Sequence, residues 1–159
     1  MSEPEALRKH LLDLLQGANA HVNFDSVVSG FPVERAGAKP RGAPHTGWQL
    51  LEHMRIAQWD ILEFSRDPKH VSPEWPDGYW PKAESPPSKT AWSKSARAFR
   101  ADLKAMAELV ADPANDLLAP FPHGQGQTLL REALLVADHN AYHAGQFVLL
   151  RRLLGVWKE

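Results

Sequence analysis

The stretch TLLREALLVADHNAYHAGQFVLLRRLLGVW, residues 128–157, decides the fold of this chain. It contains no proline and is rich in Leu, Ala and Val, so it predicts one long helix. Residues four positions apart lie on the same face of a helix, one turn above the other. His139 and His143 therefore face the same way, at a spacing that allows two imidazoles to bind one metal ion. Apolar residues border them, which indicates that both histidines face the interior.

The same face carries three further candidates for chemistry. Glu132 lies two turns before His139, where a buried carboxylate could orient an imidazole or act as a base. A Glu in the first turn of a helix also interacts favourably with the helix dipole, and this is the alternative interpretation. Tyr142 and Gln146 flank the histidine pair and could hydrogen-bond a water on the metal.

A third histidine is needed, because two histidines at this spacing are by themselves more often structural than metal-binding. His53 is the best candidate. It lies in WQLLEHMRIA, residues 48–57, on a helical face that is otherwise apolar, so it also projects toward a core. Three neutral imidazoles suit zinc or nickel and leave positions of the ion open. His45 and His123 are weaker candidates, since a histidine in a loop is usually solvated.

These two motifs resemble those of the DinB-like (DinB/YfiT) superfamily of candidate metalloproteins. That superfamily has a Trp-x-x-Leu-x-His type of pattern on its second helix and a His-x-x-x-His pair on its last helix. Here the elements read WQLLEH, residues 48–53, and DHNAYHAGQ, residues 138–146. The resemblance runs from about His45 to the C-terminus, and the layout of four segments extends it to the start. It implies a bundle with a crossover connection, a metal site and a dimer.

Proline divides the chain into helical windows. All 13 prolines lie outside four windows, 5–31, 45–67, 88–112 and 123–159. Proline is expelled from helix interiors, and no window shows the alternation of a strand. We therefore predict an all-α fold, a four-helix bundle with long crossover loops, as one domain over residues 1–159. The expected helices lie near 3–18, 46–66, 86–111 and 127–155.

Local signals indicate where these helices begin. SEPE, residues 2–5, and TGWQ, residues 46–49, both have the form of a capping box. Ser85 is the expected cap of the third helix, with Pro86 in its first turn. Val22 to Pro44 is expected to be a long connection with a short helical turn at residues 25–28.

A proline-rich segment, residues 67–87, connects the second and third predicted helices. It carries six prolines and three large aromatic residues, Trp75, Tyr79 and Trp80. We expect these side chains to pack over a stripe of Trp48 and Trp59 on the second helix, rather than to line a substrate pocket.

Two of the predicted helices carry a second apolar stripe that must be covered, either by the same chain or by a partner chain. Trp48 and Trp59 lie off the histidine face of their helix, as Ala141 and Val148 do on the last helix. Packing within one chain is the simpler explanation. A symmetric homodimer is the other, and the resemblance to the family favours it.

Composition excludes several classes of function. The net charge of -1 leaves no basic surface for nucleic acid. No apolar run is long enough to span a membrane, and the start lacks the apolar centre of a signal peptide, so we expect a cytoplasmic protein. The chain has no cysteine, which excludes disulfides, thiolate ligands and a cysteine nucleophile.

Three interpretations of function follow. An ion held by three neutral histidines keeps its full charge and attracts water or an anion. The resemblance implies thiol-dependent transfer or isomerisation, since the superfamily includes a maleylpyruvate isomerase that uses a low-molecular-weight thiol. Any such thiol must come from a cofactor, because the chain has no cysteine. Metal-dependent hydrolysis is the second interpretation, and a non-catalytic, stress-associated metal-binding or interaction module is the third.

Overall fold

The structure, a computed structural model, describes residues 3–17 and 20–157, and these ranges form α-helices and no named strand. This confirms the all-α prediction. Four helices are long and one, α2, is short. Their bounds are α1 Glu3–Gln16, α2 Phe24–Val28, α3 Gly47–Arg66, α4 Lys89–Ala111 and α5 Leu129–Leu153.

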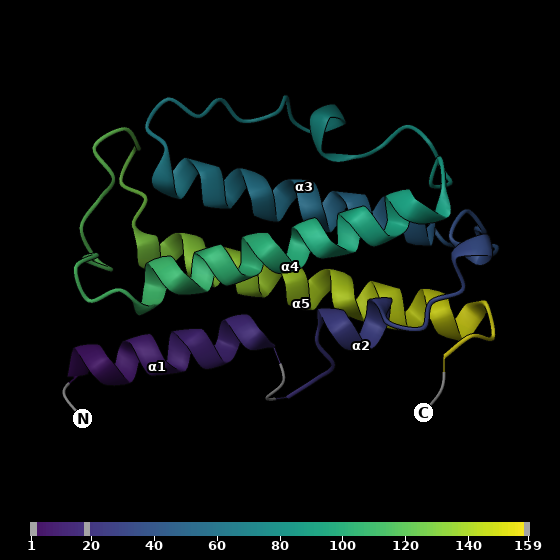
Figure 1. The fold of residues 1–159 in the computed structure, drawn as a ribbon, viewed down its shortest axis with the longest axis horizontal. Helices are drawn as coiled ribbons and strands as arrows, with labels where there is room; N and C mark the ends of the chain where they lie inside the picture. Colours follow the sequence, from purple (N-terminus) through teal and green to yellow (C-terminus); the bar gives the residue numbers. More distant parts are fainter. Residues whose placement is uncertain (1–2, 18–19, 158–159) are drawn as a thin grey trace.

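The four long helices form a bundle in which α4 and α5 both contact α1 and α3 (Figure 1). Helices α3 and α4 run in the same direction, and α1 and α5 run in the opposite one. Two consecutive helices can be parallel only if the chain returns between them. The segment between α3 and α4 does so by running back along the length of α3, which is the expected crossover.

Most of the predicted helix starts are correct. At α3 the capping box is complete: the Gln49 amide N–H donates to Thr46 Oγ1 at 3.2 Å, and the Thr46 amide N–H donates to Gln49 Oε1 at 3.1 Å. Helix α5 begins after the cap residue Thr128, within the predicted range. The short turn expected at residues 25–28 is α2. The SEPE box includes Ser2, and the expected end of the first helix is residue 18; both lie outside the described residues.

The predicted start of α4 is wrong by three residues. The cap is Ser88, whose Oγ accepts a hydrogen bond from the Ala91 amide at 3.0 Å, and not Ser85. The reason is the pair Pro86-Pro87. A residue that precedes proline is disfavoured in the helical region, so Pro86 cannot belong to a first turn and the helix starts only after the pair.

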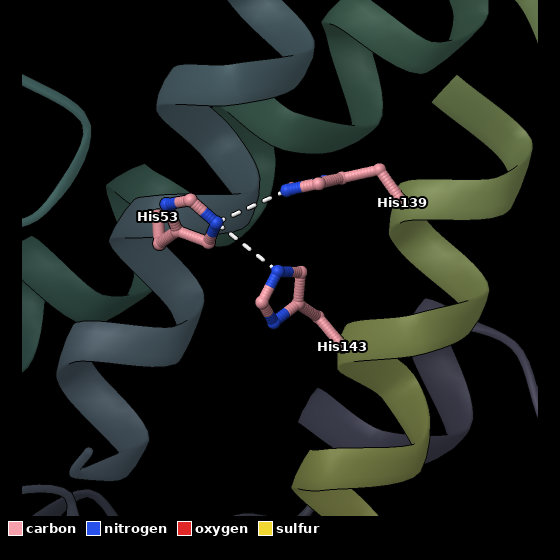
Figure 2. A group of neighbouring side chains, drawn as sticks. All are labelled: His53, His139 and His143. Carbon is pink, nitrogen blue, oxygen red and sulfur yellow. Dashed lines mark hydrogen bonds between the residues drawn. The ribbon is translucent and has the colours of Figure 1, made fainter. Parts of the chain in front are cut away.

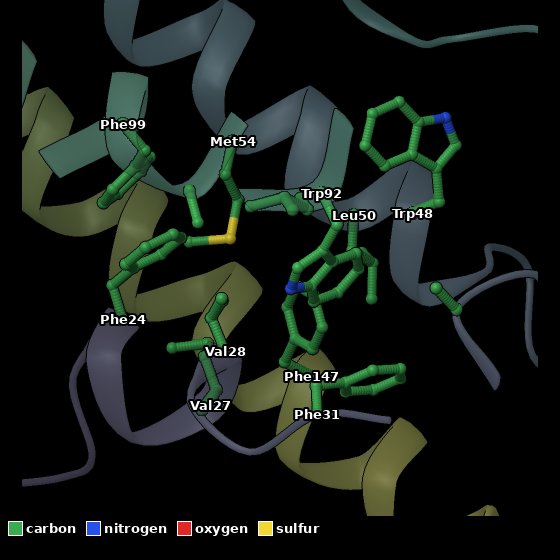
Figure 3. Packing of buried hydrophobic residues seen from close by; sticks show 14 of the residues in the cluster. Phe24, Val27, Val28, Phe31, Trp48, Leu50, Met54, Trp92, Phe99 and Phe147 are labelled. Atoms are coloured by element: carbon green, nitrogen blue, oxygen red, sulfur yellow. The ribbon is translucent and has the colours of Figure 1, made fainter. Parts of the chain in front are cut away.

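The interior contains two apolar clusters. The larger one joins α2, α3, α4 and α5 and is rich in aromatic rings (Figure 3). In it, Phe24 and Phe99 stack at 3.7 Å and Phe31 and Trp92 at 5.0 Å between ring centroids. The smaller cluster packs α1 against α4 and α5. Together they fix the positions of α3 and α5, the two helices that carry the candidate ligands.

The larger cluster corrects one detail of the dimer prediction. Trp48 is only 6% exposed and belongs to this cluster, so it is wrong as an interface residue. Trp59, Ala141 and Val148 are half-buried. The homodimer itself stays a prediction. None of the helices in the described ranges combines the length and apolarity needed to cross a membrane.

Candidate metal centre

Three histidines converge between α3 and α5. His53 projects from α3, and His139 and His143 project from successive turns of α5 (Figure 2). The Nε2 atom of His53 lies 3.0 Å from Nε2 of His139 and 3.0 Å from Nε2 of His143. The candidate ligand atoms of the three residues all lie within 4.8 Å of one another. Nitrogen ligands of a tetrahedral zinc ion, with Zn–N bonds of about 2.0–2.1 Å, lie about 3.3 Å apart, so the spacing suits one ion.

Burial keeps these imidazoles neutral. His53 is 3% exposed and His143 is 5% exposed, whereas His139 is half-buried. Burial lowers the pKa of His53 to about 4, although a hydrogen bond to the Tyr79 carbonyl opposes the shift. Burial, with the nearby His143 and His53, lowers the pKa of His139 to about 3. It also lowers the pKa of His143. At neutral pH all three rings are therefore in the form that binds metals.

Hydrogen bonds at the outer nitrogens orient two of the rings. His53 Nδ1 lies 3.0 Å from the Tyr79 carbonyl oxygen, and His143 Nδ1 lies 2.8 Å from Gln146 Oε1. A carbonyl or amide oxygen only accepts, so each Nδ1 carries the proton and each Nε2 presents a lone pair. The 3.0 Å contact between His53 and His143 is then one lone pair facing another. Two neutral rings in these tautomers cannot hydrogen-bond there, whereas a cation between them satisfies both.

No hydrogen bond at the outer nitrogen fixes the tautomer of His139. Its Nδ1 is buried and has no hydrogen-bond partner among the described residues. A proton on Nε2 of His139 could satisfy its own contact with His53, but the contact between His53 and His143 would remain unsatisfied. The donor set therefore fits an ion that accepts all three lone pairs.

The proline-rich segment covers this centre, and Trp80 packs against the apolar cluster that contains Trp48 while its ring also reaches the histidines. The Trp80 ring stacks on His53 at 3.7 Å and 3°, and on His45 at 3.8 Å and 16°, so it lies between the two imidazoles. Trp75 is 71% exposed. The sequence analysis named Trp80 and Tyr79 but did not predict their contacts with His53. Their only signal was the density of aromatic residues in a rigid loop.

The three other candidate residues of α5 have different surroundings. Gln146 accepts a hydrogen bond from a candidate ligand, His143, which is a positioning contact. Tyr142 is 65% exposed, with its ring near the His143 ring. Glu132 is buried and accepts a hydrogen bond from Arg131 Nη1 at 2.7 Å, and burial raises the pKa of its carboxyl group. Its predicted contact with His139 is not among the hydrogen bonds of the described residues.

The two loop histidines also differ from each other. His45 lies near the centre but is separated from His53 by the Trp80 ring. His123 is exposed, donates to the Phe64 carbonyl at 2.8 Å and stacks on Phe121. The structure therefore places neither residue in the group of three histidines that could hold an ion.

A helical bundle with three convergent imidazoles from two helices defines a class of candidate metal-binding proteins. The model of one family, described as the DinB superfamily, matches residues 6–147. The chain therefore belongs to the DinB superfamily, and the resemblance found in its motifs is confirmed. Neither a curated protein nor a solved structure matches it.

Proposed function

We propose that the protein binds one divalent transition metal ion through the Nε2 atoms of His53, His139 and His143, and uses it to activate a low-molecular-weight thiol for transfer or isomerisation. The observation that carries the proposal is the 3.0 Å contact between the lone pairs of His53 and His143, which only a cation satisfies while both rings are neutral. Imidazole ligands favour nickel or zinc over magnesium.

The thiol step follows from charge. A divalent ion held by three neutral ligands keeps its full charge and can stabilise a thiolate at neutral pH. The chain has no cysteine, so the thiol must come from a small molecule. The chain's own part is to orient the imidazoles through Tyr79 and Gln146, and to shield one face of His53 with the Trp80 ring.

Hydrolysis that relies on a carboxylate base beside the metal is supported less well. Two buried carboxyl groups lie on the same helices as the histidines, and both have other partners. Glu132 accepts a hydrogen bond from Arg131, and Asp60 contacts His70 and Tyr79. Among the described residues, no carboxyl group hydrogen-bonds to the three histidines. A metal-bound thiolate, formed when the thiol releases its proton to water, would itself be the nucleophile, so the thiol chemistry does not depend on such a carboxylate.

The test uses the full chain loaded with cobalt, a spectroscopic substitute for zinc. Addition of 2-mercaptoethanol should produce a thiolate-to-metal charge-transfer band, and addition of ethylene glycol, which has no thiol, should not. A His139→Ala variant should show neither cobalt binding nor the band. Absence of metal binding would overturn the whole proposal. Metal binding without the band would overturn the thiol step.

A further inference from the structure

A buried pair of side-chain amides joins α3 to α5 beside the candidate metal centre. Asn140 Nδ2 donates to Gln58 Oε1 at 2.8 Å, and Gln58 Nε2 donates to the Phe99 carbonyl oxygen of α4 at 2.7 Å. Gln58 is 1% exposed. The Phe99 carbonyl oxygen can only accept, so it fixes which end of each amide faces the other. We call the pair of Gln58 and Asn140 the amide joint.

The amide joint lies close to the candidate ligands along both helices. Asn140 directly follows His139 and lies three residues before His143. Gln58 lies five residues after His53. At a rise of about 1.5 Å per residue, these separations are about 1.5–7.5 Å along the helix axes. A shift of the joint would therefore move the histidines with it.

Apolar packing alone specifies the position of α5 weakly in this stretch. The buried apolar residues between Leu129 and Phe147 are all small, namely Ala133, Val136, Ala137 and Ala144. Contact between apolar surfaces is non-directional, and small side chains interlock little with a neighbouring helix. Between α3 and residues 129–146 of α5, the hydrogen bonds are those of the three histidines and the amide joint. The joint is thus the directional contact that can fix the register of the two helices before an ion binds.

We propose that Gln58 and Asn140 are positioning residues of the metal centre. They set the separation and register at which α3 and α5 present the three histidines. This inference rests on the proposed function. A metal site needs its ligands held within about 0.5 Å of the productive geometry. The joint meets this need because one end is the residue next to His139, and the other end is hydrogen-bonded to a third helix.

Stability alone does not account for these two amides. Asn140 Oδ1 is buried and has no hydrogen-bond partner among the described residues. A buried acceptor without a partner destabilises a protein, whereas replacing both partners of a buried hydrogen bond by apolar groups of similar shape can be neutral or stabilising. The Phe99 carbonyl would keep its bond within α4. The double variant Gln58→Met/Asn140→Leu should therefore be at least as stable as the wild type.

The experiment compares this double variant with a packing variant of the same helix. Urea denaturation of chelator-treated protein measures stability, and the visible spectrum and a competition titration of cobalt-loaded protein measure the geometry and affinity of the site. The double variant should keep its stability, show a changed d–d spectrum and bind cobalt about tenfold more weakly, the lower end of the range for residues that orient metal ligands. Val136→Ala is the matched control, since Val136 is 1% exposed and lies one turn before Asn140. It should be less stable but keep the wild-type cobalt affinity and spectrum.

The outcomes separate the inference from the proposed function. Wild-type cobalt affinity and spectrum in the double variant would overturn the inference and leave the proposed function standing. Loss of cobalt affinity in Val136→Ala to the same extent would also overturn it, because any loosening of α5 would then have the same effect. If circular dichroism shows that the double variant does not fold, Gln58→Leu/Asn140→Ala, which adds no bulk, is compared with Val136→Ala by the same cobalt measurements. Failure of the wild type to bind cobalt would overturn the proposed function and the inference together.

Discussion

Two buried polar clusters contain residues of α3, and only one of them is chemically complete. In the first, His53 meets His139 and His143, three groups of the same kind. In the second, Asp60 Oδ1 lies 2.7 Å from Nε2 of His70, and Asp60 Oδ2 accepts a hydrogen bond from the Tyr79 hydroxyl at 2.6 Å. Asp60 is seven residues after His53, so the two clusters share one face of the helix, two turns apart.

The comparison shows how a candidate metal site differs from a structural network. In the Asp60 cluster, donors meet acceptors, and the buried polar groups need nothing further. In the histidine cluster, two acceptors face each other because the other nitrogens of His53 and His143 already donate. In these tautomers a cation would satisfy both acceptors of the histidine cluster. We therefore expect metal to act on the histidine cluster, and the Asp60 cluster to act on stability alone.

Loss of a ligand should have the largest effect. Replacing His53, His139 or His143 by Ala should lower metal affinity roughly a thousandfold or more, equivalent to about 4 kcal/mol, because two imidazoles hold an ion far less well than three. His123→Ala is the matched control and should keep wild-type metal content. Elemental analysis after dialysis against a weak chelator checks this, with circular dichroism to show that the helices remain. Equal metal content in all four variants would contradict the assignment.

Acidification of the metal-free protein should have the next largest effect. The pKa of His53 is about 4 and that of His139 about 3 in the native state, both lowered by burial from 6.5. Between about pH 6.5 and pH 4 the unfolded chain binds protons that the native site does not. The free energy of unfolding should therefore fall as the pH falls, by about 1.4 kcal/mol per pH unit for each histidine. Urea denaturation of chelator-treated protein at several pH values measures it.

The control for the acid effect is the double variant His53→Ala/His139→Ala. Its carboxyl groups and its remaining histidines are those of the wild type, so the difference in pH dependence isolates the two buried imidazoles. The variant should lose stability less steeply as the pH falls. An identical pH dependence of the two proteins would show that His53 and His139 are not held neutral by burial.

Loss of the central carboxyl group should destabilise the protein without releasing metal. Asp60→Ala leaves the His70 nitrogen and the Tyr79 hydroxyl without their shared acceptor. Two unsatisfied polar groups predict a loss of about 3 kcal/mol in the free energy of unfolding. Denaturant titration at neutral pH measures it, and metal content should equal that of the wild type. Loss of metal in this variant would show that the two clusters are not independent.

Loss of a positioning contact should have a smaller effect on the metal. Gln146 accepts a hydrogen bond from Nδ1 of His143, which directs Nε2 inward. Gln146→Ala should lower metal affinity roughly 10–100-fold, the range found for outer partners of metal ligands. Gln146→Glu keeps an acceptor at the same position and should restore the affinity. A competition titration with a metal indicator measures both, and equal weakening in the two variants would contradict a positioning role.

Much of the bundle, and the residues of the histidine cluster, could be predicted from sequence because both depend on periodicity. The proline-free windows located the long helices, and the spacing of His139 and His143 placed both on one inward face. The metal that they are predicted to bind is still to be tested. The cover of the site could not be predicted. Trp80 reaches His53 through a loop that has no regular period, and such contacts over long sequence separations leave no pattern in the chain.

The smallest expected effect tests the residue that joins the two clusters. The Tyr79 carbonyl oxygen accepts from His53, and the Tyr79 hydroxyl donates to Asp60. Burial, and then the hydrogen bond to Asp60, raise the pKa of this hydroxyl to about 12, so it stays protonated and remains a donor at neutral pH. Tyr79→Phe removes the hydroxyl but keeps the carbonyl, and should therefore cost about 1 kcal/mol of unfolding free energy with no change in metal affinity. Denaturant titration measures the unfolding free energy, and metal titration of the same preparation measures the affinity. A matching loss of metal would mean that the hydroxyl fixes the carbonyl in place, and that the loop holds His53 through the Asp60 cluster.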